Sequence, residues 1–384
     1  MIRTSFLVAT LALLTNVGFA QDDWTVDDFI AETGVREGPV PARELDGWRP
    51  DPTILLRDSL GQAEELARDF PAANIITVQD DAELAASAPT ADVIIGYCAA
   101  EAIGAAPRLV WVQIYSAGAE RCLAVEELHS GKVVLTNMQK MSSPAIGEHA
   151  VAMALSLARG LVRYGKAMPD GEWRRDMTQN PDMFSVSGKT MLVVGLGGIG
   201  TAAARRADAL GMRVIATRNS SREAPAFVDY VGLSDELPEL LGTADIIVNA
   251  LPLTASTAGI FDEAAFAQAK PGAYFINVGR GGTVVTDALV EALESGRLAG
   301  AGLDVTDPEP LPSDHPLWQM SNVIITPHVS WAGADRRLHN LLLRIGNYLN
   351  LGYKFVNHHT ESREYIQHLG RYNLRSGFVY LCMI

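Results

Sequence analysis

Short apolar runs alternate with helical segments over two long stretches of the chain, on either side of one long helix. The first stretch holds runs with the length of buried strands: Thr53–Leu56, Asn74–Val78, Asp92–Tyr97, Leu109–Ile114 and Val133–Leu135. Segments of helical composition, such as Gly61–Asp69 and Asp81–Ser87, lie between them. This alternation predicts a parallel sheet covered by helices.

The long helix begins at Ser143 and Pro144, since serine can cap free backbone amides and proline is tolerated in the first helical turn. Its apolar face runs through Ala150, Met153, Ala154 and Leu157 to about Leu161. A second alternating stretch starts at Lys189 and continues to about His328, and one more helix is expected at about 334–351. The pattern therefore predicts an α/β protein with two doubly wound parallel-sheet domains.

Composition and charge agree with two globular domains and exclude some partners. The chain has 384 residues, of which 48% are hydrophobic and 20% charged. Its formal charge is −14, from 45 acidic and 31 basic side chains. Such a surface repels phosphate backbones and anionic lipid, so we expect no nucleic-acid or peripheral membrane partner. A small anionic substrate would need a local positive site.

The cysteines and histidines predict no metal site. Cys98, Cys122 and Cys382 lie far apart, form no CxxC pair and are odd in number, so we expect structural thiols rather than a disulfide framework. The tail at 352–384 departs from the preceding pattern, and its histidines at 358, 359 and 368 are interpreted as part of a surface tail; a metal site formed by these histidines is the alternative.

The N-terminus has the layout of a secretory signal peptide at 1–20. Arg3 precedes an uncharged, apolar stretch from Thr4 to Ala20, and Gly18 and Ala20 place small residues where a signal peptidase cleaves. The stretch is short for a membrane span. We expect export by a Sec-type route; an uncleaved anchor or a misassigned start codon, which would leave the protein cytoplasmic, is the alternative.

A glycine-rich loop in the second stretch predicts a dinucleotide site. The buried strand Met191–Val194 runs into Gly195-Leu196-Gly197-Gly198-Ile199-Gly200, and an Ala-rich helix follows at Thr201–Leu210. Here a tight turn, close approach of backbone to a pyrophosphate and close helix packing require glycine, and the helix N-terminus faces the phosphates. The expected cofactor contacts are Gly195, Gly197, Gly198, Ile199 and Gly200.

The end of the next strand favours NADP over NAD. An NAD enzyme places an acidic residue there, but the strand Arg213–Thr217 is followed by Arg218, Asn219, Ser220, Ser221 and Arg222. Arginine and hydroxyl groups suit a 2′-phosphate, and the missing carboxylate removes a repulsion. We assign Arg218 and Ser220 to this phosphate and keep NAD as possible; two arginines on a solvated loop are the alternative.

Three further stretches carry a family resemblance. They are 277–282 (NVGRGG), 303–310 (LDVTDPEP) and 326–330 (TPHVS). Together with the glycine loop they closely resemble the D-isomer-specific 2-hydroxyacid dehydrogenases, of the glyoxylate/hydroxypyruvate reductase type, over about 53–351. The resemblance implies an oxidoreductase that transfers a hydride between NAD(P)H and a small 2-oxo acid or D-2-hydroxy acid.

The chemistry of that reaction explains three of the residues. His328 can give and take the proton on the substrate oxygen because imidazole titrates near neutral pH. Glu309 would hold the ring and favour its protonated form. Arg280 can bind the substrate carboxylate and polarise the carbonyl, which supplies the positive site that an acidic protein needs.

The resemblance also implies further contacts. Asp304 would help to position the cofactor near the nicotinamide. Other residues would line the cofactor's path, namely Ala250, Leu251, Pro252, Val278 and Gly279. The backbone amides of Ala117 and Gly118 would receive the substrate carboxylate. Glu148 and His149 match the family's linking helix and are read as structural. Trp331 stands where small residues are common in the family, so we expect a narrower pocket mouth.

The expected domains follow from these assignments. An extension at 21–50 precedes a flavodoxin-like substrate domain at 51–142, which 333–351 completes. A Rossmann dinucleotide-binding domain at 143–332 is inserted, and the atypical tail at 352–384 follows. A homodimer is what the resemblance implies. The alternatives in function are formate or phosphite oxidation on the same scaffold, or a non-catalytic dinucleotide-sensing protein; the acidic charge and the signal-like segment disfavour the second.

Overall fold

The structure, a computed structural model, covers most of the two alternating stretches. It describes residues 46–59, 61, 63–119, 122, 125–130, 132–137, 140, 142–175 and 183–332, with the backbone of two-residue strands at 37–38, 354–355 and 381–382. The signal-like segment at 1–20, the helix expected at 334–351 and the tail histidines lie outside these residues.

The first lobe is built on a parallel sheet with the strand order β15-β6-β5-β4-β2-β3. Its strands are β2 (Thr53–Leu56), β3 (Asn74–Thr77), β4 (Val93–Ile95), β5 (Trp111–Gln113), β6 (Val134–Asn137) and β15 (Leu381–Cys382). The connecting helices are α2 (Ala63–Asp69), α3 (Asp81–Ser87), α4 (Ala100–Gly104), η2 (Ala88–Thr90) and η3 (Glu126–Ser130). The strands expected from the sequence are confirmed.

The end of the chain contributes to the first lobe in a way that the sequence did not indicate. Strand β15 runs parallel to β6, with Leu381 beside Thr136. Two further short strands, β1 (Glu37–Gly38) and β14 (Lys354–Phe355), pair antiparallel. The tail therefore supplies backbone to the sheet rather than only a surface extension.

The second lobe holds a parallel sheet with the order β13-β12-β11-β10-β7-β8-β9. Its strands are β7 (Thr190–Val194), β8 (Arg213–Thr217), β9 (Tyr230–Gly232), β10 (Ile246–Asn249), β11 (Ala273–Asn277), β12 (Leu298–Leu303) and β13 (Val323–Ile325). Its helices are α8 (Gly198–Ala209), α9 (Leu237–Leu241), α10 (Glu263–Gln268), α11 (Thr286–Glu294), η6 (Ser234–Glu236), η7 (Gly281–Thr283) and η8 (Pro316–Trp318). From β7 the chain adds β8 and β9 toward one edge of the sheet, and from β10 it adds β11, β12 and β13 toward the other edge. The order of strands therefore reverses between β7 and β10.

Helices cover both faces of this sheet, because its strands are apolar on both sides. Along β7, Leu192 and Val194 belong to a core shared with α9, α10 and α11. Met191 and Val193 alternate with them and belong to a core shared with α6 and α8. Successive residues of a strand face opposite sides, so an unbroken apolar run requires a helix layer on each side. The predicted fold class is confirmed.

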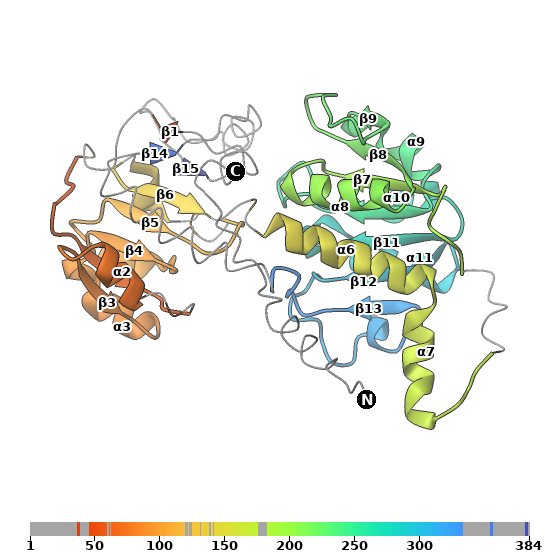
Figure 1. The fold of residues 1–384 in the computed structure, drawn as a ribbon, viewed down its shortest axis with the longest axis horizontal. Helices are drawn as coiled ribbons and strands as arrows, with labels where there is room; N and C mark the ends of the chain where they lie inside the picture. Colours follow the sequence, from red (N-terminus) through yellow and green to blue (C-terminus); the bar gives the residue numbers. More distant parts are fainter. Residues whose placement is uncertain are drawn as a thin grey trace, which may run out of the picture.

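Helix α6 (Ser143–Ala158) leads from the first lobe into the second, and α7 (Leu161–Ala167) with η4 (Met168–Asp170) follows it (Figure 1). It begins at the expected residue with proline in its first turn, but the expected serine cap is absent: the N-cap residue is Ser142, and its side chain caps no amide. In the described part of the chain no single helix is long and apolar enough to cross a membrane; one pair passes that test only across a 76° bend, Ser143–Ala158 with Leu161–Asp170.

The expectation of unpaired structural thiols is wrong for two cysteines. Cys98 and Cys122 form a disulfide, with a Cα–Cα distance of 5.5 Å. Cys98 follows β4, and Cys122 lies beyond the loop that follows β5. These strands are neighbours in the sheet, so residues 24 positions apart meet at one edge. Spacing along the chain did not reveal this proximity.

Candidate active site

Three strand ends bring together the loops of the predicted catalytic residues. Arg280 follows β11, Glu309 lies in the loop after β12, and His328 follows β13. The three strands are parallel and adjacent in the order β13-β12-β11. Their carboxyl ends therefore lie at one edge of the sheet, which is where open α/β sheets bind ligands.

His328 and Glu309 make a direct contact. His328 Nδ1 lies 2.7 Å from Glu309 Oε1, and each side chain is 43% exposed. An ionised carboxylate can only accept a hydrogen bond, so this contact places a proton on Nδ1 and leaves Nε2 as the ring atom that exchanges a proton. The pair can thus hold a proton donor in a fixed direction at a surface that a substrate can reach.

The backbone around His328 is unusual. Its φ of 54° lies in the left-handed region, where non-glycine residues are uncommon. The backbone N–H of His328 donates to the carbonyl oxygen of Asp304 at 2.8 Å, and Trp331 Nε1 donates to the carbonyl oxygen of His328 at 3.0 Å. Hydrogen bonds on both sides of the residue therefore hold this conformation.

Asp304 organises the turn that carries His328. Its carboxylate, 2% exposed, accepts hydrogen bonds from the backbone N–H groups of Val329 (2.9 Å) and Ser330 (3.1 Å) and from the hydroxyl of Thr326 (2.7 Å). A buried carboxylate requires such donors. The family resemblance implied that Asp304 helps to position the cofactor; within the described residues the hydrogen bonds of its carboxylate are to this turn.

Helix α6 supports the same turn. His149 Nε2 lies 3.0 Å from Thr326 Oγ1 and 3.9 Å from the Asp304 carboxylate. His149 thus contacts the side chains that support the turn, whereas the Glu309 carboxylate contacts His328. The sequence indicated a structural role for His149, but it did not predict the contact between His149 and Thr326.

Buried polar side chains at the ends of β10 and β11 and in η7 hold the Arg280 loop. Asn277 Nδ2 (3.3 Å) and Thr283 Oγ1 (2.6 Å) donate to the carbonyl oxygen of Arg280. Asn249, at the end of β10, donates to both Asn277 Oδ1 (3.0 Å) and Thr283 Oγ1 (2.7 Å). Asn249, Asn277 and Thr283 were missed as positioning residues, although an asparagine that ends an otherwise apolar strand is a signal that could have found two of them.

A close backbone approach joins the Arg280 loop to the Glu309 loop. A Cβ atom on Gly281 would lie 1.8 Å from the carbonyl oxygen of Thr306. No side chain fits at Gly281, so the two loops are in backbone contact. Arg280 and Glu309 are thereby kept on adjoining loops.

The glycine loop fits a pyrophosphate. Gly195 has a φ of 94°, a conformation that favours glycine. A Cβ on Gly200 would lie 2.2 Å from the Gly195 carbonyl oxygen, so the turn and the helix can approach this closely only if residue 200 is glycine. A Cβ on Gly197, by contrast, would meet nothing within 4 Å, which leaves open space over the start of α8. This loop lies at the point between β7 and β10 where strand order reverses. Gly279, whose Cβ would lie 2.6 Å from the Leu251 carbonyl oxygen, packs on the adjoining loop.

The two arginines after β8 differ in their surroundings. Arg222 is engaged: its Nη2 lies 2.6 Å from Glu236 Oε1, and its Nη1 lies 3.1 Å from the Tyr230 hydroxyl. This pairing, with the Leu233 N–H and the Tyr230 hydroxyl, lowers the pKa of Glu236 to about 2. The Nε of Arg218 is buried and has no hydrogen-bond partner among the described residues, and Ser220 beside it is exposed. An orphaned buried donor of this kind fits an anionic ligand group.

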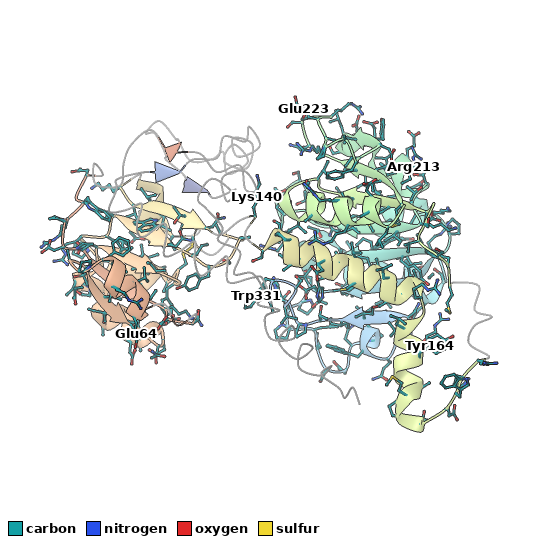
Figure 2. All side chains as sticks on the ribbon, viewed as in Figure 1. Glu64, Lys140, Tyr164, Arg213, Glu223 and Trp331 are labelled. Atoms are coloured by element: carbon teal, nitrogen blue, oxygen red, sulfur yellow. A yellow bond between two sulfur atoms is a disulfide. The ribbon has the colours of Figure 1, made fainter. Side chains whose placement is uncertain are left out.

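The predicted carboxylate-binding loop belongs to the first lobe. Ala117 and Gly118 follow β5, whereas Arg280, Glu309 and His328 follow strands of the second lobe (Figure 1). Asn137 Nδ2 donates to the Ala117 carbonyl oxygen and Ser116 Oγ to that of Gly118, both at 2.7 Å. Figure 2 shows Lys140 and Trp331 in the region between the lobes. The two halves of the predicted site are therefore divided between two lobes.

Together the fold and the site define an α/β dehydrogenase with a nicotinamide-dinucleotide domain, and comparison with known proteins agrees. The family model described as 'D-isomer specific 2-hydroxyacid dehydrogenase, NAD binding domain' matches residues 151–330 of the chain. A glyoxylate reductase of Pyrococcus furiosus is 36% identical over 239 residues, covering 60% of this chain and 69% of that protein.

Solved structures agree with the same family. The NADPH-dependent glyoxylate/hydroxypyruvate reductase of Sinorhizobium meliloti, in complex with NADP and sulfate, has 29% identity and a TM-score of 0.65, covering 77% of this chain and 92% of that one. The NAD-dependent formate dehydrogenase of Staphylococcus aureus, in complex with NAD, has 25% identity and a TM-score of 0.64, covering 76% and 94%. The chain belongs to the D-isomer specific 2-hydroxyacid dehydrogenase family, and it is an NAD(P)-dependent dehydrogenase.

Proposed function

We propose that this enzyme reduces a small 2-oxo acid of the glyoxylate or hydroxypyruvate type to the D-2-hydroxy acid, with NADPH as the preferred cofactor. The observation that carries the proposal is the 2.7 Å contact between His328 Nδ1 and Glu309 Oε1 on loops adjoining that of Arg280. Relatives named glyoxylate reductase and hydroxypyruvate reductase support this substrate class.

In this mechanism His328 Nε2 donates a proton to the carbonyl oxygen of the substrate as the hydride arrives at carbon 2. Glu309 holds the imidazole by Nδ1 and stabilises its charged form before transfer. Arg280 binds the substrate carboxylate and polarises the carbonyl, and the amides of Ala117 and Gly118 receive the same carboxylate from the first lobe. Closing the two lobes would exclude water from this step.

The nicotinamide dinucleotide supplies the hydride when it is bound. Residues 195–200 would hold its pyrophosphate at the start of α8, and Arg218 with Ser220 would hold a 2′-phosphate. Asp304 would help to position the cofactor near the nicotinamide. Five residues would line the path to it, namely Ala250, Leu251, Pro252, Val278 and Gly279. The orphaned Nε of Arg218 supports the preference for NADPH.

A turnover screen tests the proposal. Purified enzyme is mixed with NADPH or NADH and with glyoxylate, hydroxypyruvate, pyruvate or bulkier 2-oxo acids, and cofactor oxidation is followed. We expect turnover of the small acids with NADPH. Reduction of NAD by formate or phosphite, with no 2-oxo-acid reduction, would instead favour oxidation chemistry on this scaffold; no cofactor oxidation by folded enzyme would overturn the enzyme mechanism.

His328→Ala should lower kcat by about 10²–10⁴-fold, the usual contribution of a positioned general acid, and leave NADPH binding nearly unchanged. The matched control is His315→Ala, since His315 precedes η8, where its Nδ1 accepts from the Leu317 N–H. Kinetics and NADPH fluorescence titration measure the two effects. A His328→Ala enzyme with wild-type kcat would exclude His328 as the general acid.

We also propose that the protein is exported and acts as a homodimer. The charged-apolar-small pattern of residues 1–20 and the Cys98–Cys122 disulfide support export, because disulfides persist mainly in oxidising compartments. Cell fractionation with sequencing of the mature N-terminus tests export, and a cytosolic protein that starts at Met1 would contradict it.

Light scattering of the purified enzyme tests the proposed homodimer.

A further inference from the structure

The disulfide lies at the edge of the first sheet where the predicted substrate loop begins and ends. Cys98 is three residues beyond the end of β4, and Cys122 is beyond the loop that β5 leads into. Ala117 and Gly118 lie within that loop. The disulfide therefore joins the far end of this loop to the neighbouring strand.

The near end of the loop is held in another way. The Tyr115 hydroxyl donates to the carbonyl oxygen of Arg57 at 2.9 Å, and Arg57 follows β2. A Cβ on Gly96 would lie 2.6 Å from the Tyr115 ring, so the ring packs directly on the backbone that follows β4. The Tyr115 hydroxyl is protonated at neutral pH, and burial raises its pKa further, so that it remains a donor in alkaline solution as well.

The far end is held by a buried link. Cys122 is 1% exposed and belongs to the core of the first lobe, and Cys98 packs against that core. Between the two ends, the hydrogen bonds to the Ala117 and Gly118 carbonyl oxygens come from Asn137 and Ser116. Within the described part of this loop, the carbonyl oxygens of Ala117 and Gly118 are thus engaged, whereas no hydrogen bond from their backbone N–H groups is found. These N–H groups can be presented to an anion while both ends of the loop are held.

We propose that the Cys98–Cys122 disulfide positions this loop for binding the substrate carboxylate, so that its reduction weakens substrate binding and leaves the cofactor lobe intact. The inference rests on the proposed function, since it assigns the loop to the substrate. Preformed amide donors bind an anion well only while their geometry is held, and removing a cross-link restores chain freedom to the loop. The glycine loop and Arg218 lie in the other lobe and do not depend on the link.

The chemical step is a thiol–disulfide exchange with an external dithiol. One thiolate of dithiothreitol attacks a sulfur of the disulfide, its second thiol completes the exchange, and dithiothreitol becomes a cyclic disulfide. Cys98 and Cys122 gain two electrons and two protons and become thiols. An oxidising dithiol couple reverses the reaction, so the change is reversible in one sample.

The test compares oxidised enzyme with enzyme reduced by dithiothreitol, with thiol counts verified by alkylation and mass spectrometry. We expect KM for the 2-oxo acid to rise about tenfold, equivalent to about 1.4 kcal/mol of lost binding. The change in kcat and in the Kd for NADPH should be under about twofold, because their residues lie in the second lobe. Reoxidation should restore KM.

Two variants complete the experiment. Cys98→Ser/Cys122→Ser should have the raised KM and no response to dithiothreitol, whereas Cys382→Ser is the matched control and should behave as wild type in both states. If the double variant does not fold, the reduced wild-type enzyme still gives the comparison. An unchanged KM after verified reduction, or a parallel loss of NADPH binding, would overturn the inference alone. No turnover in either state with NADPH bound would overturn the proposed function and, with it, this inference.

Discussion

At the scale of single residues, the direction of the His328 ring depends on contacts that do not touch substrate. A left-handed φ of 54° is costly for a residue with a Cβ and persists because its surroundings impose it. Asp304 and Trp331 bond the backbone on either side, and Glu309 bonds the ring. We therefore attribute much of the pre-organisation of the site to Asp304, a buried carboxylate that accepts hydrogen bonds from the turn.

Arg218 and Arg222 allow a matched test of cofactor preference. Arg218→Gln should raise KM for NADPH about tenfold or more and leave KM for NADH unchanged, since a charge-assisted hydrogen bond to a phosphate contributes about 1.5–3 kcal/mol. Arg222→Gln should leave the NADPH/NADH ratio unchanged, because its guanidinium is paired with Glu236. Steady-state kinetics with both cofactors measure this. A wild-type enzyme that uses NADH as well as NADPH would contradict the assignment of Arg218.

At the scale of elements, helix α6 links the lobes and also packs on the helix that follows the glycine loop. A Cβ on Gly147 would lie 2.7 Å from the Ala202 Cβ and 2.8 Å from the Ala203 backbone nitrogen. Small residues at this crossing let α6 and α8 approach closely. The position of the glycine loop relative to the linking helix thus depends on a glycine outside the dinucleotide motif.

Alanine substitutions at two helix glycines should change the free energy of unfolding in opposite directions. Gly147→Ala should lower the free energy of unfolding by about 1–3 kcal/mol, because α8 backbone would have to move. Gly165→Ala, in exposed α7 with nothing within 4 Å of the added Cβ, should raise it by about 0.5–1 kcal/mol through helix propensity. Urea unfolding followed by circular dichroism measures both. Equal effects of the two variants would show that α6 and α8 are not in close contact.

The segment after β9 should make stability depend on acid pH. Glu236 has a folded pKa of about 2 against an ordinary value of 4.5, so its stabilising effect is complete above about pH 4.5 and is lost as pH falls toward 2. Glu236→Gln should therefore lose less stability than wild type between pH 5 and pH 2. Glu223→Gln, in the exposed loop before β9, is the control. Parallel pH profiles for Glu236→Gln and wild type would contradict the ion pair with Arg222.

At the scale of the whole molecule, the site is divided between lobes that have separate cores. One pair of apolar clusters surrounds the first sheet, and another pair surrounds the second. The first lobe carries the disulfide and the proposed substrate loop, and the second carries the glycine loop and the strand ends with the proposed catalytic residues. We therefore expect the cofactor to stabilise mainly the second lobe, whereas the proposed substrate site includes residues of both lobes.

This division predicts independent shifts in thermal unfolding. NADPH at a hundredfold excess over its Kd should stabilise the second lobe by about 2.7 kcal/mol. Reduction of the disulfide, which spans 24 residues, should destabilise the first lobe by about 3.5 kcal/mol in the chain-entropy account. Calorimetry with and without NADPH and dithiothreitol should show two transitions that move separately. A single transition that both treatments shift would contradict separate lobes.

Local patterns predicted the features that local physics controls. A strand, a glycine turn and a helix in succession identified 191–210, since each requirement involves residues a few positions apart. The same holds for the five strands predicted in the first stretch, which appear as β2 to β6, and for Arg213–Thr217 in the second. It also holds for the order of Arg280, Glu309 and His328, because parallel strands bring their carboxyl ends to one edge. The Ser143 cap failed at this scale, as Ser142 precedes the helix without capping it.

The sequence by itself determined the fold class, through its hydrophobic periodicity, and the family, through the short motifs that carry the resemblance. The same motifs supplied the residues that we propose for the chemistry. Only the tertiary structure decided which distant side chains support them. His149 meets Thr326 across 177 positions, Asp304 meets the turn of His328, and Cys98 meets Cys122. Such pairs arise from strand order and helix packing, which place remote residues together without leaving a local pattern in the chain.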